Sequence, residues 1–192
     1  MSERGFILCV SGPSGSGKTS LCDRLAEEHV FVRRSISLTT RAQRSGETES
    51  EDYIFVSHQD FEQMRVGGLF LETAEVFGNF YGTPRQPVEA ALAEHDVIVM
   101  DIDTLGANAI KKEYQKNCVT VFVHPPSMAE LERRLRGRKQ NTPEDLARRL
   151  KEAAREISES SNYDYQLTNL EFRQAYEELK RMVFAERRIL TP

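Results

Sequence analysis

Three short runs of apolar, β-branched residues stand out along the chain: Phe6–Val10 (FILCV), Val97–Asp101 (VIVMD) and Val119–His124 (VTVFVH). Apolar residues in these runs are continuous rather than alternating with polar ones. Such continuity is typical of strands that are buried on both faces of a parallel sheet. We therefore expect each run to be a strand of such a sheet.

Helical patterns lie between these runs and after them. Helices are predicted at Thr19–His29, at Pro84–Glu94 and at about Glu171–Arg188. Two further helices are expected to open at capping boxes, Ser127 with Glu130 and Thr142 with Asp145. Alternation of strands and helices over 192 residues predicts one α/β domain with right-handed crossovers.

Two segments depart from this alternation. Between residues 35 and 83, the stretches SISLTTR, DYIFVS, LFLETAEV and NFYGT resemble short strands joined by turns such as Arg44–Glu47. They indicate a small antiparallel excursion inserted into the sheet topology. The segment Leu131–Arg155 carries nine Lys or Arg and four acidic residues, whereas the whole chain has a net charge of −4.

Composition narrows the function classes. The acidic net charge gives no global attraction to nucleic acid or to anionic membranes, and no stretch approaches the length of a membrane span. The three cysteines show no metal-ligand spacing and are expected to be small buried side chains in a reducing compartment. We expect a cytoplasmic protein with no nucleic-acid or membrane partner.

The first strand is followed directly by a glycine-rich loop that fits the pattern G-x-x-x-x-G-K-[ST] in full. Its residues are Gly12, Pro13, Ser14, Gly15, Ser16, Gly17, Lys18 and Thr19. Glycines allow backbone N–H groups to point at phosphates, and the helix that follows directs the positive end of its dipole at the same anion. The loop therefore predicts an ATP site.

Three side chains at this loop have expected roles. Lys18 should reach the β- and γ-phosphates, and the Thr19 hydroxyl should bind Mg²⁺. Asp101, at the end of a predicted strand, is the natural partner of Mg²⁺ through water. On spacing alone, a helix cap is an equally plausible role for Asp101.

The motifs GPSGSGKT, SISLTTRAQRSGE, DYIFVS, LETAEVFGNFYGT and DID, in this order and spacing, resemble those of guanylate kinase over essentially the whole chain. The resemblance implies a P-loop NTPase-type parallel sheet flanked by helices, with an inserted mixed-β GMP-binding region and a helical lid. It implies one domain over residues 4–188, with a core (4–34, 87–127 and 156–188), a GMP-binding region (35–86) and a lid (128–155).

The resemblance also implies the reaction. The γ-phosphoryl group of ATP would pass to GMP or dGMP, giving ADP and GDP or dGDP in a Mg²⁺-dependent step of purine nucleotide metabolism and GMP recycling. The acceptor phosphate has a second pKa of ~6 and is mostly dianionic at neutral pH, so it needs no general base. We expect direct in-line transfer without a covalent intermediate, promoted by positioning and charge neutralisation.

The inserted region carries the residues that would hold GMP. Arg41 and Arg44, three residues apart in a turn-rich stretch, can fork onto one phosphate. By resemblance they hold the GMP phosphate together with Tyr53 and Tyr81. Apart from the resemblance, arginines in a loop are usually solvated and tyrosines in strands are usually core.

Glu72 lies in a mostly apolar stretch, where a carboxylate needs strong donors. Guanine offers two parallel donors, N1–H and the 2-amino group, whereas adenine would leave the carboxylate unpaired. Ser37 can donate to the guanine carbonyl, and Thr83 and Asp103 are the remaining family positions around the base. Taken alone, the stretch would favour a solvent-facing Glu72.

The basic segment suits a lid. Arg134 and Arg138 share a helix face, Arg149 lies on the next helix, and all three resemble the family's lid arginines. With Lys18 and Arg41, they form the expected catalytic set. A nucleic-acid patch is the weaker alternative, because no aromatic residue lies among these arginines.

The chain departs from the usual family pattern at three places: Thr73 where an aromatic is common, AQRSGE without its usual proline, and TNLEF in place of a more acidic stretch. In the last stretch Asn169 remains as the expected adenine-side contact. One alternative is another acceptor, such as a ribose bisphosphate, but Glu72 and Ser37 argue against it because a sugar has no use for their donor pattern. The other is a noncatalytic guanylate kinase-like module that binds phosphoproteins, but such modules typically lose the loop lysine or the lid arginines, and this chain keeps both. Oligomeric state is not predicted.

Overall fold

The computed structural model describes residues 5–76, 78–137 and 142–188. A five-stranded sheet forms its centre, in the order β2-β7-β1-β8-β9, and every neighbouring pair is parallel. Its strands are β1 (Phe6–Ser11), β2 (Val32–Arg34), β7 (Val97–Asp101), β8 (Cys118–His124) and β9 (Tyr165–Thr168). The three runs predicted as strands are β7, β1 and β8, side by side at the centre of the sheet.

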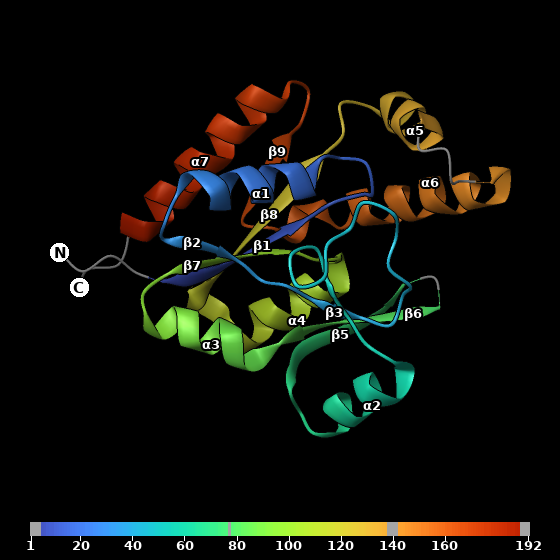
Figure 1. The fold of residues 1–192 in the computed structure, drawn as a ribbon. Coiled ribbons are helices and arrows are strands. Elements are labelled where there is room, and N and C mark those ends of the chain that lie inside the picture. Colours follow the sequence, from blue (N-terminus) through green and yellow to red (C-terminus); the bar gives the residue numbers. More distant parts are fainter. Residues whose placement is uncertain (1–4, 77, 138–141, 189–192) are drawn as a thin grey trace.

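Helices cover both faces of this sheet (Figure 1). The helices of this core are α1 (Lys18–Glu28), α3 (Arg85–Ala93), α4 (Thr104–Tyr114) and α7 (Phe172–Arg188), with short 3-10 turns at Gln115–Asn117 and Ser160–Asn162. Alternate β1 residues Phe6, Leu8 and Val10 pack with α1 and α7, whereas Ile7 and Cys9 pack with α3 and α4. Burial on both faces explains why the run is apolar throughout.

A second sheet, in the order β4-β3-β6-β5, forms the inserted region. It consists of β3 (Leu38–Thr39), β4 (Ile54–Phe55), β5 (Phe70–Val76) and β6 (Asn79–Pro84), with helix α2 (His58–Val66). Phe61 of α2 stacks on Phe70 and Phe80, which gives this region its own small core. The fold thus places an independent lobe beside the ends of the central strands.

The expectation of an antiparallel excursion is wrong at one pair of strands, whereas the mixed-β region that the resemblance implies is confirmed. β3 and β4 are parallel, whereas β3–β6 and β5–β6 are antiparallel. The loop 40–53 is long enough to return the chain to the starting edge before β4 begins, which a tight hairpin turn could not do. The inserted sheet is therefore mixed.

Two helices, α5 (Met128–Gly137) and α6 (Pro143–Ser158), project from the core at the edge near the phosphate loop (Figure 1). Leu131 and Leu135 of α5 pack on Leu146 and Ala153 of α6. Both predicted caps are present, since the Glu130 N–H donates to Ser127 Oγ (3.1 Å) and the Asp145 N–H donates to Thr142 Oγ1 (3.2 Å). The carboxylate of Glu130 binds Arg133 and Arg134, so only half of that capping box forms.

Other predicted boundaries differ by about one residue. Pro84 caps α3, which begins at Arg85, instead of occupying its first turn. All three cysteines are free and buried, as expected. Within the described part of the chain, no helix combines the length and the apolar composition needed to cross a membrane.

Candidate functional site

The phosphate loop joins β1 to α1 at the carboxyl edge of the sheet and depends on its glycines. Gly12 has φ of 140°, and a Cβ atom there would lie 2.4 Å from the carbonyl oxygen of Val123. Gly17 has φ of 94°, and a Cβ atom there would lie 2.3 Å from Asn169 Nδ2. Any other residue would push the loop off the sheet, so these glycines fix the loop against the N-terminus of α1.

Asn169 supports this loop from outside. Its Nδ2 donates to the carbonyl oxygen of Ser16 (2.8 Å), and its backbone N–H donates to the carbonyl oxygen of His124 (2.9 Å). The side chain is buried. Asn169 therefore holds the loop in place, and its expected contact with adenine stays a prediction.

Lys18, Thr19 and Asp101 meet at the end of the loop. Thr19 Oγ1 donates to Asp101 Oδ2, and Lys18 Nζ lies 3.6 Å from Asp101 Oδ1. Asp101 lies beside Thr19 because β7, which ends at Asp101, and β1, which leads into the phosphate loop, are adjacent parallel strands. Their carboxyl ends meet at one edge of the sheet. A hydroxyl and a carboxylate are the oxygen ligands that suit Mg²⁺.

The described residues contain no group of three His, Cys, Asp or Glu side chains that could hold a metal ion. A Mg²⁺ ion that keeps its waters and binds substrate phosphates needs only one or two protein ligands. The Thr19 and Asp101 pair fits such an ion.

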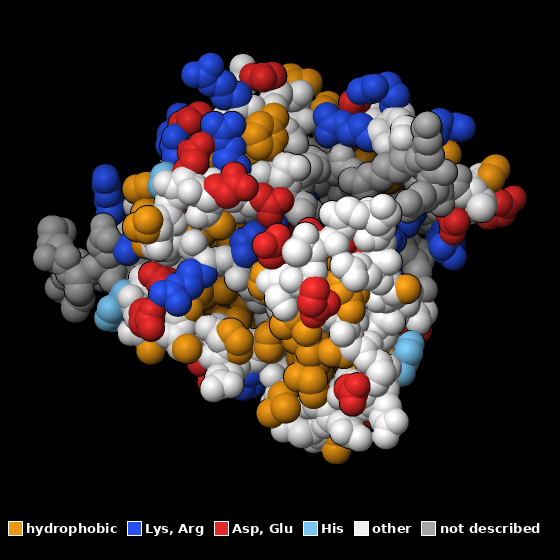
Figure 2. Space-filling view, viewed as in Figure 1, with side chains coloured by type: hydrophobic (Ala, Val, Ile, Leu, Met, Phe, Trp, Pro, Cys, Tyr) orange, Lys and Arg blue, Asp and Glu red, His pale blue; other side chains and the backbone are white. Residues whose placement is uncertain are grey.

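Basic side chains of α5 and α6 approach the same loop. Figure 2 shows Lys and Arg side chains gathered over α5. Arg134 Nη1 donates to the carbonyl oxygen of Gly15 (3.3 Å), and Arg149 Nη1 donates to Ser14 Oγ (3.4 Å). Arg138, the third predicted lid arginine, lies outside the described residues. The structure thus brings two of the three beside the phosphate loop.

On the inserted region, Arg41 lies against the two predicted tyrosines. Its guanidinium carbon is 5.3 Å from the centre of the Tyr53 ring, and the Tyr53 and Tyr81 rings are 5.8 Å apart. Burial lowers the pKa of Arg41, but hydrogen bonds with Glu47 and Tyr81 outweigh it and raise that pKa. Arg41, Tyr53 and Tyr81 form one cluster, whereas the Arg44 side chain is exposed.

Glu47 is the residue of this cluster that sequence reasoning missed. Its carboxylate accepts from Arg41 Nη2 (2.7 Å) and Nη1 (3.0 Å) and from the backbone N–H of Arg44 (2.8 Å). Nη1 of Arg41 also donates to the carbonyl oxygen of Ala42 (2.7 Å). Glu47 thus occupies the Nη1 and Nη2 edge of the guanidinium, and the adjoining edge consists of Nε–H and the second N–H of Nη2. That edge can bind an anion through two parallel hydrogen bonds.

Three of the four residues expected around a base, namely Glu72, Thr83 and Asp103, also come together. Thr83 Oγ1 donates to Glu72 Oε1 (2.6 Å) across the paired strands β5 and β6. Asp103 caps α4 by accepting from the Gly106 N–H (2.7 Å). A Cβ atom on Gly106 would lie 3.0 Å from Glu72 Oε2 and 3.2 Å from Asp103 Oδ1. The two carboxylates therefore share one small space above this glycine.

The environment of Glu72 raises the pKa of its carboxyl group. Burial raises its pKa to about 7, and the nearby charge of Asp103 adds to the rise, although the Thr83 hydrogen bond opposes it. Within residues 5–76, 78–137 and 142–188, no Lys or Arg forms an ion pair with Glu72. A paired set of N–H donors from a ligand would stabilise the ionised form.

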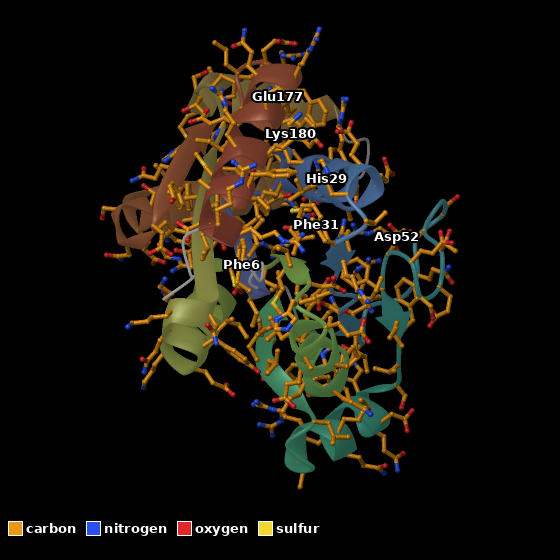
Figure 3. All side chains as sticks on the ribbon, turned by 90° about the vertical axis from the view of Figure 1, so that its left-hand side faces the viewer. Phe6, His29, Phe31, Asp52, Glu177 and Lys180 are labelled. Atoms are coloured by element: carbon orange, nitrogen blue, oxygen red, sulfur yellow. The ribbon has the colours of Figure 1, made fainter. Side chains whose placement is uncertain are left out.

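A small cavity of about 40 Å³ connects the phosphate loop with the inserted region. Its lining residues come from both parts and are Thr19, Arg34, Ser35, Ser37, Asp52, Tyr53 and Asp101. Asp52 lies on the loop of the inserted region, beside the α1 side of the core (Figure 3). The oxygen atoms of Thr19 and Asp101 that suit a metal therefore share this cavity with Tyr53, one member of the Arg41, Tyr53 and Tyr81 cluster. Transfer between two bound phosphates requires such proximity.

The chain resembles known proteins over nearly its full length. The sequence model of the family described as guanylate kinase matches residues 4–186. A guanylate kinase of Symbiobacterium thermophilum is 42% identical over 184 residues, covering 96% of this chain and 87% of the relative. One from Caulobacter vibrioides is 44% identical over 185 residues, with coverage of 96% and 87%. The crystal structure of guanylate kinase from Anaplasma phagocytophilum matches with a TM-score of 0.83 at 35% identity, covering 97% of this chain and 88% of that one.

Proposed function

The chain belongs to the guanylate kinase family and is an ATP:GMP phosphotransferase, and we propose that it transfers the phosphoryl group in line, to GMP and dGMP, by using the residues described above. The observation that carries the assignment of the acceptor site is the Glu72 carboxylate, held by Thr83 and placed beside Asp103. A half-buried carboxylate without a cationic partner among its described neighbours is suited to the paired N–H donors of guanine.

The acceptor phosphate is proposed to bind Arg41, Arg44, Tyr53 and Tyr81. Glu47 already occupies one edge of the Arg41 guanidinium, which leaves the Nε and Nη2 edge for the phosphate. Ser37, one of the residues that line the adjoining cavity, would donate to the guanine carbonyl. Binding at these positions would direct the acceptor oxygen toward the phosphate loop.

The donor is proposed to bind the loop Gly12–Thr19, with Lys18 at its β- and γ-phosphates. Mg²⁺ would be held by the Thr19 hydroxyl and, through water, by Asp101, and when bound it neutralises charge on the phosphoryl group in transit. Arg134 and Arg149, together with Arg138, would supply further positive charge from the lid. Because the acceptor is already a dianion, no side chain has to remove a proton.

We assign residues 35–86 to the acceptor lobe and 128–155 to the lid. The inserted sheet has its own core around Phe61, and α5 and α6 share a separate one, which supports the division. Helix α6 runs without interruption from Pro143 to Ser158, across the proposed lid boundary. Closure of the lid would therefore carry α6 as a rigid body and exclude water from the donor. Free buried cysteines are consistent with a cytoplasmic location.

GMP binding is expected to strengthen as the pH rises from 6 to 8. The carboxylate of Glu72 must be ionised to accept both guanine donors, and its pKa is about 7 in the free protein. At pH 6 only about a tenth of the molecules are competent, which weakens the apparent affinity roughly tenfold relative to pH 8. Calorimetric titration with GMP at several pH values measures this change.

The same pKa fixes the sign of the stability change without ligand. The folded state binds the Glu72 proton more tightly than the unfolded state, whose glutamate pKa is about 4.3. The stability from this group is therefore complete below about pH 4 and is lost as the pH rises toward 7.

The Glu72→Gln variant is the control for the pH dependence of GMP binding. It removes the titration of residue 72 but keeps the titration of the GMP phosphate near pH ~6. If GMP affinity depended on pH in the same way in Glu72→Gln as in the wild type, the assignment of Glu72 to the guanine base would be contradicted.

The function is tested by a panel of acceptors. ADP release from ATP and Mg²⁺ is measured with GMP, dGMP, AMP, CMP, UMP and ribose phosphates. We expect turnover with GMP and dGMP and only background rates with the others, because only guanine pairs both of its donors with Glu72. Equal rates with AMP and GMP would overturn the role given to Glu72, and turnover of a ribose phosphate alone would overturn the acceptor class.

A further inference from the structure

Arg34, the last residue of β2, lines the cavity between the phosphate loop and the inserted region. We propose that Arg34 is an additional cation of the acceptor site, which donates its Nε–H to an oxygen of the GMP phosphate while Asp23 holds the guanidinium in place. This inference rests on the proposed binding of GMP in the same site.

The alternation of β2 directs its two arginines to different partners. Arg33 pairs with Glu94 and Asp96 and is half exposed. Arg34 is much less exposed, with 22% of its side chain accessible, and its Nη1 donates to Asp23 Oδ1 on α1. The Arg34 guanidinium is thus tethered by one nitrogen beside the start of α1. Arg33 has no such relation to the cavity, since it is not among the lining residues.

Two donors that belong to residues lining this cavity lack an acceptor. The Nε of Arg34 and the Oγ of Ser35 are both buried and meet no hydrogen-bond partner within residues 5–76, 78–137 and 142–188. A buried donor without an acceptor is costly, and a charged one especially so. An anionic oxygen that enters the cavity would satisfy both groups. A ligand oxygen is the simplest reason to retain an arginine here.

Arg34 lies near Tyr53, one of the residues assigned to the GMP phosphate, because both line the same cavity. Burial raises the pKa of Tyr53, as do Asp101 and Tyr81, whereas Arg41 and Arg34 both lower it. Both guanidinium groups therefore lie close enough to act on the hydroxyl that is assigned to the GMP phosphate. An anion held by Tyr53 and Arg41 would also lie within the field of Arg34.

The size and acidic lining of the cavity limit what can enter. A volume of about 40 Å³ admits an oxygen atom of a phosphate but not the whole group. Two carboxylates also line the cavity, Asp101 at the Lys18 end and Asp52, whose Oδ2 accepts from the Thr48 N–H (2.7 Å). The phosphate would therefore approach from the side of Arg34 and Ser35, with its remaining oxygens on Arg41 and the tyrosines.

The test compares Arg34→Gln with Arg33→Gln, which removes the neighbouring charge from the same strand. Affinities for GMP and for guanosine are measured by calorimetry, and the KM values for GMP and ATP are measured by ADP release. We expect Arg34→Gln to weaken GMP binding roughly 10- to 100-fold, the usual range for a hydrogen bond to a charged group. Guanosine affinity and the KM for ATP should stay near the wild-type values, and Arg33→Gln should bind GMP normally.

Equal losses of GMP and guanosine affinity in Arg34→Gln, or no loss of either, would overturn the proposal. If Arg34→Gln does not fold, Arg34→Lys and Asp23→Asn decide in its place. Lysine keeps the charge without the planar fork, and asparagine releases the tether, so each should weaken GMP binding several-fold and leave guanosine binding unchanged. Failure of the wild-type protein to phosphorylate GMP would instead count against the proposed function, which separates the two results.

Discussion

Glu72→Gln is expected to lower kcat/KM for GMP on the order of a thousandfold and to abolish most of the preference for GMP over AMP. The carboxylate can accept from both N1–H and the 2-amino group of guanine. An amide offers only one acceptor, and its NH₂ group faces one of the guanine donors. A site built to match the hydrogen bonds of one substrate can prefer it to an analogue by several powers of ten in kcat/KM, and this preference is lost when the match is removed. Rates of ADP release with GMP and AMP, over a range of acceptor concentrations, measure the change.

Glu75→Gln is the matched control, because Glu75 lies three residues further along β5 and is exposed. It should retain wild-type rates with both acceptors. Glu72→Gln should also keep its KM for ATP, since the donor binds at the phosphate loop. A variant that loses activity with GMP and AMP in equal proportion would point to general damage of the inserted sheet. Retained selectivity would show that another group reads the base.

The parts of the fold predicted from sequence are those with a strong local pattern. The strands β1, β7 and β8 are continuous apolar runs because they are buried on both faces. The strands β2 and β9 were not predicted. Each lies at an edge of the sheet, has only three or four residues and buries a single side chain, so neither leaves a recognisable period.

Helix α2 was not predicted from the sequence for a different reason. Its N-cap is readable in the sequence, since Ser57 accepts from the Asp60 N–H (3.1 Å). Its only buried residue is Phe61, however, so the helix has no apolar stripe. The helix is stabilised by stacking of Phe61 on β5 and β6, a tertiary contact that sequence spacing does not reveal.

The candidate site was predictable where residues lie at the ends of strands or in a contiguous motif. Thr19 and Asp101 meet because β1, which leads through the phosphate loop to α1, is adjacent to β7, and Glu72 and Thr83 meet because β5 and β6 are paired. Glu47 was predicted only as part of a turn, since nothing in its spacing shows that its carboxylate would bind Arg41. Arg34 was missed because it occupies a strand too short to predict.

Lys18→Met is expected to reduce kcat roughly a thousandfold while GMP binding stays unchanged. Methionine has similar length and apolar bulk but carries no charge, so it cannot follow the negative charge on the donor phosphates during transfer. Loss of one preorganised donor typically costs 10²–10³ in kcat, and the lysine ammonium contributes a full charge. In the free protein Lys18 lies 3.6 Å from Asp101, so its removal also leaves that carboxylate without its ion pair.

Single-turnover rates with saturating ATP, Mg²⁺ and GMP separate the chemical step from binding in this variant. Calorimetry with GMP should give the wild-type affinity, because Arg41, Tyr53 and Glu72 lie on the inserted region and do not depend on the loop lysine. Lys112→Met, on the exposed face of α4, is the matched control and should keep full activity. A Lys18→Met protein with near wild-type kcat would mean that the lid arginines alone neutralise the phosphoryl group in transit, and that Lys18 serves only to hold Asp101.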